Sequence, residues 1–150
     1  MTDKAEQILL ELVKICGTLG AKTVARDHRF TVKAGDATFI DIRSEGEQFL
    51  PPEGASTKPA KAKLRRWLAK AEIRVYLHSN DPTKLRGEYS GIWLAFLDGF
   101  QASRIVAGTH TEPAIIPVGY VPEIECTYHQ PGEAHDCGLI QISLGIPFDR

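Results

Sequence analysis

The hydrophobic repeat of the chain changes after about residue 21, and this change constrains the fold more than any other feature. Before it, apolar residues recur at spacings of three and four, as on one buried face of a helix. These residues are Ala5, Ile8, Leu9, Leu12, Ile15, Cys16 and Leu19. After it, short β-prone runs dominate. The sequence therefore predicts an N-terminal helix, which Thr2 or Asp3 can cap and Gly17 or Gly20 can end.

The next stretch predicts strands joined by tight turns. Runs at 22–26, 29–33 and 37–43 are separated by short turn-like segments, which favours an antiparallel meander. Residues 44–58 contain two prolines and two glycines and predict a loop.

A second helix is predicted over residues 58–70. Leu64, Trp67 and Ala71 return to helical spacing, and Pro59 lies where the first turn of a helix tolerates proline. On this helix Trp67 is expected to pack into the core. From residue 72 onward, alternation of Ile73, Val75 and Leu77 with polar residues predicts a strand.

The second half of the chain predicts further strands. Residues 91–97 are apolar on both faces, and Asp98-Gly99 before residues 100–107 is a typical hairpin turn. A last hairpin is expected from 122–129 and 137–144, with Cys126 opposite Ile140 and His129 opposite Cys137. The whole, residues 1–150, predicts a single α+β domain with two helices, N-terminal and central, on a mainly antiparallel sheet.

The predicted central helix carries six positive charges and no acid between residues 58 and 70. Its outer surface would present cations suited to the phosphates of nucleic acid, to an acidic protein or to anionic lipid. These cations are Lys61, Lys63, Arg65, Arg66 and Lys70. Residues 1–80 hold 14 Lys and Arg against 10 Asp and Glu, whereas residues 81–150 hold 4 against 9. The alternative is therefore that the basic segment covers the protein's own acidic half.

A His/Cys cluster near the C-terminus is the second candidate site. Thiolate and imidazole together suit zinc, although the spacing matches no standard zinc motif. In the expected register Cys126 turns to the apolar face, so His129, His135 and Cys137 would be the ligands. Three ligands and one open position suit a metal-dependent hydrolase. A slipped register would instead allow a disulfide between Cys126 and Cys137, and the simplest alternative is a polar turn.

Common enzyme signatures for nucleotide binding, zinc proteases and α/β hydrolases are absent from the sequence. No apolar run approaches the roughly 20 residues of a membrane span, and acids occupy the N-terminus where a signal peptide is basic. Three cysteines fit a reducing compartment, so a cytoplasmic protein is expected. Three hypotheses remain open: an accessory protein that binds nucleic acid or an acidic partner, a zinc hydrolase, and an oligomer-forming structural protein.

Overall fold

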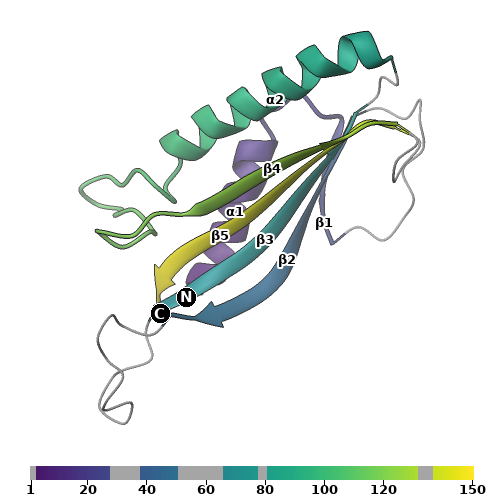
Figure 1. Cartoon of the computed structure of the whole chain (residues 1–150). Coiled ribbons are helices and arrows are strands. Elements are labelled where there is room, and N and C mark those ends of the chain that lie inside the picture. The colour runs from purple at the N-terminus through teal and green to yellow at the C-terminus, as the bar shows by residue number, and fades with distance from the viewer. Residues whose placement is uncertain (1–2, 28–37, 51–65, 78–80, 132–136) are drawn as a thin grey trace.

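The computed structural model describes residues 3–27, 38–50, 66–77, 81–131 and 137–150. They form an α+β fold with two helices and a five-stranded, mostly antiparallel sheet, as the sequence predicted (Figure 1). The elements are α1 (Lys4–Cys16), β1 (Thr23–Arg26), β2 (Phe39–Phe49), β3 (Arg66–Tyr76), α2 (Pro82–Ala102), β4 (Glu123–His129) and β5 (Leu139–Asp149). The strand order is β1-β2-β3-β5-β4, and only β1 and β2 run parallel.

The N-terminal helix is confirmed as α1. It begins after Asp3 and buries Ile8, Leu12, Ile15 and Cys16 on the face that the spacing predicted. Burial raises the pKa of the Cys16 thiol to about 12, so this cysteine is a core residue that stays protonated at neutral pH.

The second helix is α2, and the prediction of two strands over residues 91–107 was wrong. Asp81 caps the helix, because its carboxylate accepts hydrogen bonds from the Thr83 N–H at 3.0 Å and the Thr83 O–H at 2.8 Å. The buried residues Leu85, Tyr89, Phe96 and Phe100 recur at helical spacing along it. A short apolar segment of a helix that packs on a core resembles a buried strand in sequence. Only the helical spacing of three and four residues over a longer stretch distinguishes the two.

Asp98-Gly99 lies inside α2 and forms no hairpin turn. A Cβ atom at Gly99 would lie 3.1 Å from Cγ2 of Ile15 in α1. The glycine therefore allows the two helices to approach closely, and its role is set by a contact between residues that are far apart in sequence.

The predicted central helix over 58–70 was also wrong where the structure describes it. Residues 66–70 form the first half of β3, and residues 58–65 lie outside the described residues. β3 pairs along its whole length with β5 and nearly as far with β2, and this pairing overrides a short stretch of helical spacing. Trp67 is half-buried on the strand, packs against the core and meets Phe49 edge-to-face at 5.7 Å between ring centroids.

β2 takes up residues 44–49 of the predicted loop over 44–58, and it changes the expected meander; residues 51–58 lie outside the described residues. β2 runs on to Phe49 through a bulge between Ser44 and Gly46, where Gly46 adopts a φ of 95°. β1 pairs with β2 in parallel, so no antiparallel meander joins them, and residues 28–37 lie outside the described part.

The C-terminal hairpin has the predicted strands but a different register. Cys126 lies opposite Ile142, two residues from the expected Ile140, and His129 lies opposite Leu139, so the predicted pairing of His129 with Cys137 was wrong. A shift of two residues keeps every side chain on its own face of the sheet. Alternation therefore predicted the faces correctly and left the register undetermined.

Both helices pack on the same side of the sheet, α1 behind it and α2 along its upper side in Figure 1. Phe96 and Phe100 of α2 join Ile73 and Ile142 of the sheet in one core. Neither helix covers the opposite side, which we call the open face. Among the described residues, no helix is long and apolar enough to cross a membrane.

The contact at Gly99 predicts an asymmetry between two glycines of α2. Gly99→Leu should destabilise the fold by about 1–3 kcal/mol, because the side chain would collide with Ile15. Gly87→Leu is the matched control, since nothing lies within 4 Å of its Cβ position, and it should be neutral or stabilising. Urea unfolding measures both, and equal effects would contradict the close crossing of the helices.

Candidate functional site

The open face carries polar residues in cross-strand rows. Strand register places one side chain from each of β2, β3, β5 and β4 in each row. One row holds Asp41, Arg74, Gln141 and Thr127, and the next holds Arg43, Glu72, Ser143 and Glu125. These two rows of polar side chains form a polar platform that neither α1 nor α2 covers.

A hydrogen-bonded chain crosses these rows. Nε2 of His129 lies 3.0 Å from Oε1 of Gln141, whose amide nitrogen donates to Oε1 of Glu72. The other oxygen of Glu72 forms an ion pair with Arg74 at 3.2 Å. Glu72 is therefore a buried carboxylate with partners for both oxygens, which is how a buried charge is tolerated.

A second ion pair lies beside this chain. Nε of Arg43 donates to Oδ2 of Asp41 at 2.7 Å, and the Asp41 side chain is only 1% exposed. Burial lowers the pKa of Arg74, but its hydrogen bond to Tyr76 and the charge of Glu72 more than offset this, so that the net pKa is raised. The two arginines of the rows thus each serve a buried acid.

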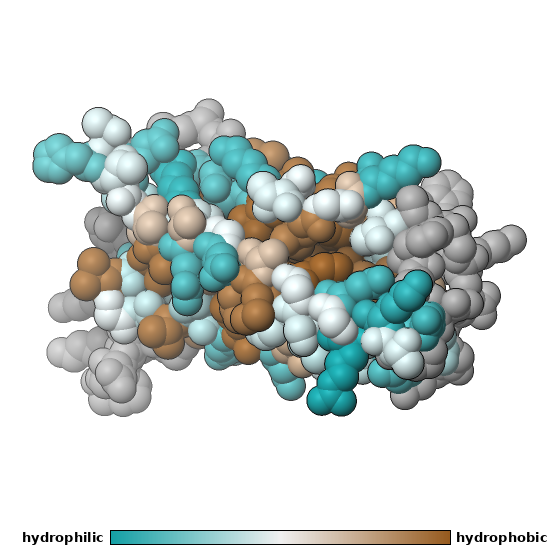
Figure 2. Space-filling view, turned by 90° about the horizontal axis from the view of Figure 1, so that it is seen from above, coloured by the Kyte–Doolittle hydropathy of each residue, from teal (hydrophilic) through white to brown (hydrophobic). Residues whose placement is uncertain are grey.

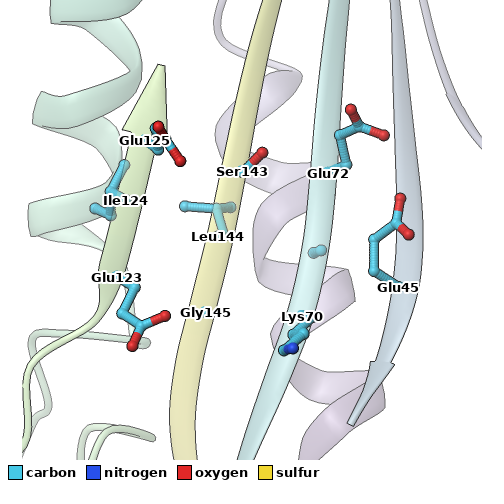
Figure 3. Close-up of a pocket in the computed structure, with 10 residues that line it drawn as sticks. Glu45, Lys70, Glu72, Glu123, Ile124, Glu125, Ser143, Leu144 and Gly145 are labelled. Carbon is cyan, nitrogen blue, oxygen red and sulfur yellow. The ribbon is translucent and has the colours of Figure 1, made fainter. Parts of the chain in front are cut away.

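A shallow depression of about 730 Å³ overlaps the second of these rows (Figure 3), and we call it the acidic trough. Its ionisable lining residues are four glutamates and one lysine: Glu45, Glu72, Glu123, Glu125 and Lys70. They come from β2, β3 and β4, while Ser143, Leu144 and Gly145 of β5 lie between them. Glu45, Glu123, Glu125 and Lys70 are exposed, so the trough presents a net negative charge to solvent.

Two glycines shape the trough. Gly145 lies in the same row as Lys70 and Glu123, and a Cβ there would lie 3.1 Å from Oε2 of Glu123 and 3.3 Å from the Leu68 side chain. Gly46 ends the bulge in β2 at the same row. The absence of two side chains leaves the floor open beneath the carboxylates, and bulges of this kind commonly redirect side chains.

The predicted nucleic-acid-binding residues that the structure describes, Arg66 and Lys70, lie in different surroundings. Arg66 donates to both oxygens of Asp149, at 2.7 and 2.9 Å, and its guanidinium stacks on Tyr120 at 3.8 Å from the ring centroid. The bonds to Asp149 raise the pKa of Arg66. Lys70 lies in the acidic trough among glutamates that repel phosphate. Lys61, Lys63 and Arg65 lie outside the described residues.

Two of the three predicted metal ligands, His129 and Cys137, are among the described residues. His129 bonds to Gln141 on the open face, and Cys137 is buried against Tyr76 and Leu139. Burial raises the pKa of the Cys126 thiol, which packs toward the core. No group of three or more His, Cys, Asp or Glu side chains suited to a metal occurs in the described residues. His135 lies outside them, so the zinc site of His129, His135 and Cys137 stays a prediction.

A smaller apolar hollow lies between the helices and the sheet. Leu19, Leu77, Ile92 and Ala95 line it together with several polar and glycine residues, and its volume is about 370 Å³. Figure 2, which looks down on the side of α2, shows apolar side chains at the floor of a hollow between polar rims. Glu88 is the lining residue with a formal charge, so this hollow has less polar chemistry to offer than the trough.

The sequence signal for the trough was weak. Glu123 and Glu125 alternate with Ile124 and Cys126, a pattern that marks a polar strand face. Glu45 and Glu72 are far from them in sequence and lay in regions predicted as a loop and as a strand start. No spacing rule joins these four residues, because they meet only through the strand order.

Comparison with models of known protein families and with curated protein sequences found no match to this chain.

The buried carboxylate predicts a stability difference between two glutamates of the trough. Glu72→Gln should cost about 1.5–3 kcal/mol, because Arg74 would lose a charge-assisted bond in a half-buried place. Glu45→Gln removes the same charge from an exposed position and should change stability by no more than about 0.5 kcal/mol. Urea unfolding at neutral pH distinguishes the two variants. A Glu72→Gln variant as stable as the unaltered protein would contradict the hydrogen-bonded chain through Glu72.

Proposed function

We propose that this protein is a binding protein that takes a cationic partner in the acidic trough. The observation that carries the proposal is the excess of carboxylates on the sheet face that neither α1 nor α2 covers: four glutamates line the trough with one lysine. Arg43, which shares a row with Glu72 and Glu125, and Arg74 of the next row are each ion-paired with a buried acid. The exposed acids Glu45, Glu123 and Glu125 therefore remain available to a partner.

The small free energy of a single exposed ion pair and the width of the trough favour a partner with several positive charges. A single solvent-exposed ion pair contributes only about 0.2–1 kcal/mol. Adjacent strands are about 4.7–4.9 Å apart, so Glu45 on β2 and Glu125 on β4 are separated by three strand spacings, or about 14 Å. One lysine or arginine side chain cannot bridge that distance. A segment that carries several cations can contact both sides of the trough, and the contributions then add.

The preformed sheet supports binding more than catalysis. The trough lies on strands of one continuous sheet, so its acids need little reorganisation when a partner arrives, which reduces the entropic cost of binding. Ser143 is the hydroxyl residue of the trough lining, and the nearby His129 is hydrogen-bonded to Gln141. The arrangement is thus a charged surface for recognition.

Nucleic-acid binding through the basic segment is the second candidate. Residues 58–65 contain four cations and no acid, which suits phosphates. This mode would use a part of the chain other than the trough, because the trough repels polyanions. The two candidates therefore predict opposite ligands.

The test measures binding of a fluorescent octalysine by anisotropy at low salt. Glu123→Gln with Glu125→Gln should weaken binding at least tenfold, which corresponds to about 1.4 kcal/mol for two lost contacts. Glu11→Gln with Glu112→Gln is the control, since it removes the same net charge outside the trough lining and should change affinity less than twofold. Binding should also weaken as salt rises.

Two results would contradict the proposal. One is absence of octalysine binding by the unaltered protein at low salt. The other is an equal effect of both double variants, because net charge rather than the trough would then be responsible. Binding of single-stranded DNA in place of octalysine would support the second candidate.

A further inference from the structure

We infer that the cationic partner binds as an additional strand along the outer edge of β4, next to residues 123–128, with its cations over the trough. This inference rests on the proposed function and specifies the form of the partner. The ligand is an extended peptide in which lysine or arginine alternates with apolar residues.

The position of β4 in the sheet supports strand addition. β4 is the last strand in the order β1-β2-β3-β5-β4, and its register joins it to β5 on one side. Among the described residues, no strand pairs with its other side. The outer backbone groups of an edge strand are a template for an added strand, whose main-chain bonds supply affinity.

The side chains of β4 alternate between the two faces of the sheet, and those on the open face are suited to cations of an added strand. Glu123, Glu125 and Thr127 are on the open face, and the first two line the trough. An added strand would place its own side chains opposite them, with Cβ atoms about 4.5–5.5 Å apart. Cations at every second residue of the partner would then meet Glu123 and Glu125 directly.

The helix side of β4 is suited to apolar residues of the same partner. Ile124, Cys126 and Tyr128 are on the helix side, and Tyr128 is 43% exposed. Its ring stacks on Tyr89 at 4.8 Å between centroids, and the Tyr89 hydroxyl donates to the His129 carbonyl at 2.6 Å. Tyr128 is thereby held in place and offers an apolar surface, so the intervening residues of the partner should be apolar.

A second copy of this chain fits the edge less well. β4 contains two glutamates and no lysine or arginine, so pairing of two β4 strands would add acids to an acidic face. The edge of β2 is a weaker site, because its first part is paired with β1 and Glu47 forms an ion pair with Arg150. Charge complementarity therefore selects a cationic strand at β4.

The experiment uses the full chain and an acetylated, amidated octapeptide in which lysine alternates with valine. A block peptide of four lysines followed by four valines has the same composition without the alternation. Two further versions carry N-methyl groups on all lysines or on all valines, which removes hydrogen-bond donors from one edge or the other. Affinities come from anisotropy, and hydrogen exchange reports protection of the backbone.

The alternating peptide should bind at least tenfold more tightly than the block peptide. One of the two N-methylated peptides should lose at least tenfold in affinity, and amides within 123–128 should exchange more slowly in the complex. Equal binding of all four peptides, with no protection of β4, would overturn strand addition while leaving the proposed function intact. If no peptide binds and octalysine does not bind either, the proposed function itself fails.

Discussion

The two helices can cover only one side of the sheet, and the rest of the structure depends on that constraint. α1 and α2 meet at Gly99 and Ile15, where the glycine has no Cβ atom to crowd the Ile15 side chain. Their close approach lets Phe96 and Phe100 reach the same core as the central strands. Burial of apolar surface in this layer drives folding, and it leaves the opposite sheet face uncovered by α1 and α2.

The polar chemistry of the open face follows from the same arrangement. Asp41 and Glu72 are buried although neither α1 nor α2 covers them, so each carboxylate needs a cation and hydrogen-bond donors. Arg43 and Arg74 supply them. Because the arginines serve the buried acids, the exposed glutamates of the trough are left to interact with solvent or with a partner.

Strand edges and side-chain charge together define what this surface can recognise. Glutamates on an edge strand discourage pairing with neutral or acidic strands, and natural sheets use such charges against aggregation. The same charges attract a strand that carries cations. A surface of this kind separates partners by repulsion as much as by attraction, which is how specificity is commonly achieved.

Residue periodicity determined much of the fold from sequence alone. It predicted α1, the strand nature of β4 and of residues 139–144 of β5, the sheet face of these strand residues, and the α+β class. It did not determine the identity of the second helix, since the spacing at Leu64, Trp67 and Ala71 is overridden by the pairing of β3 with β2 and β5. It also could not set the register of β4 against β5, because a shift of two residues preserves every face. The acidic trough was decided by tertiary structure: Glu45 and Glu72 are far in the chain from each other and from Glu123 and Glu125, and only the order of strands in the sheet brings their charges together.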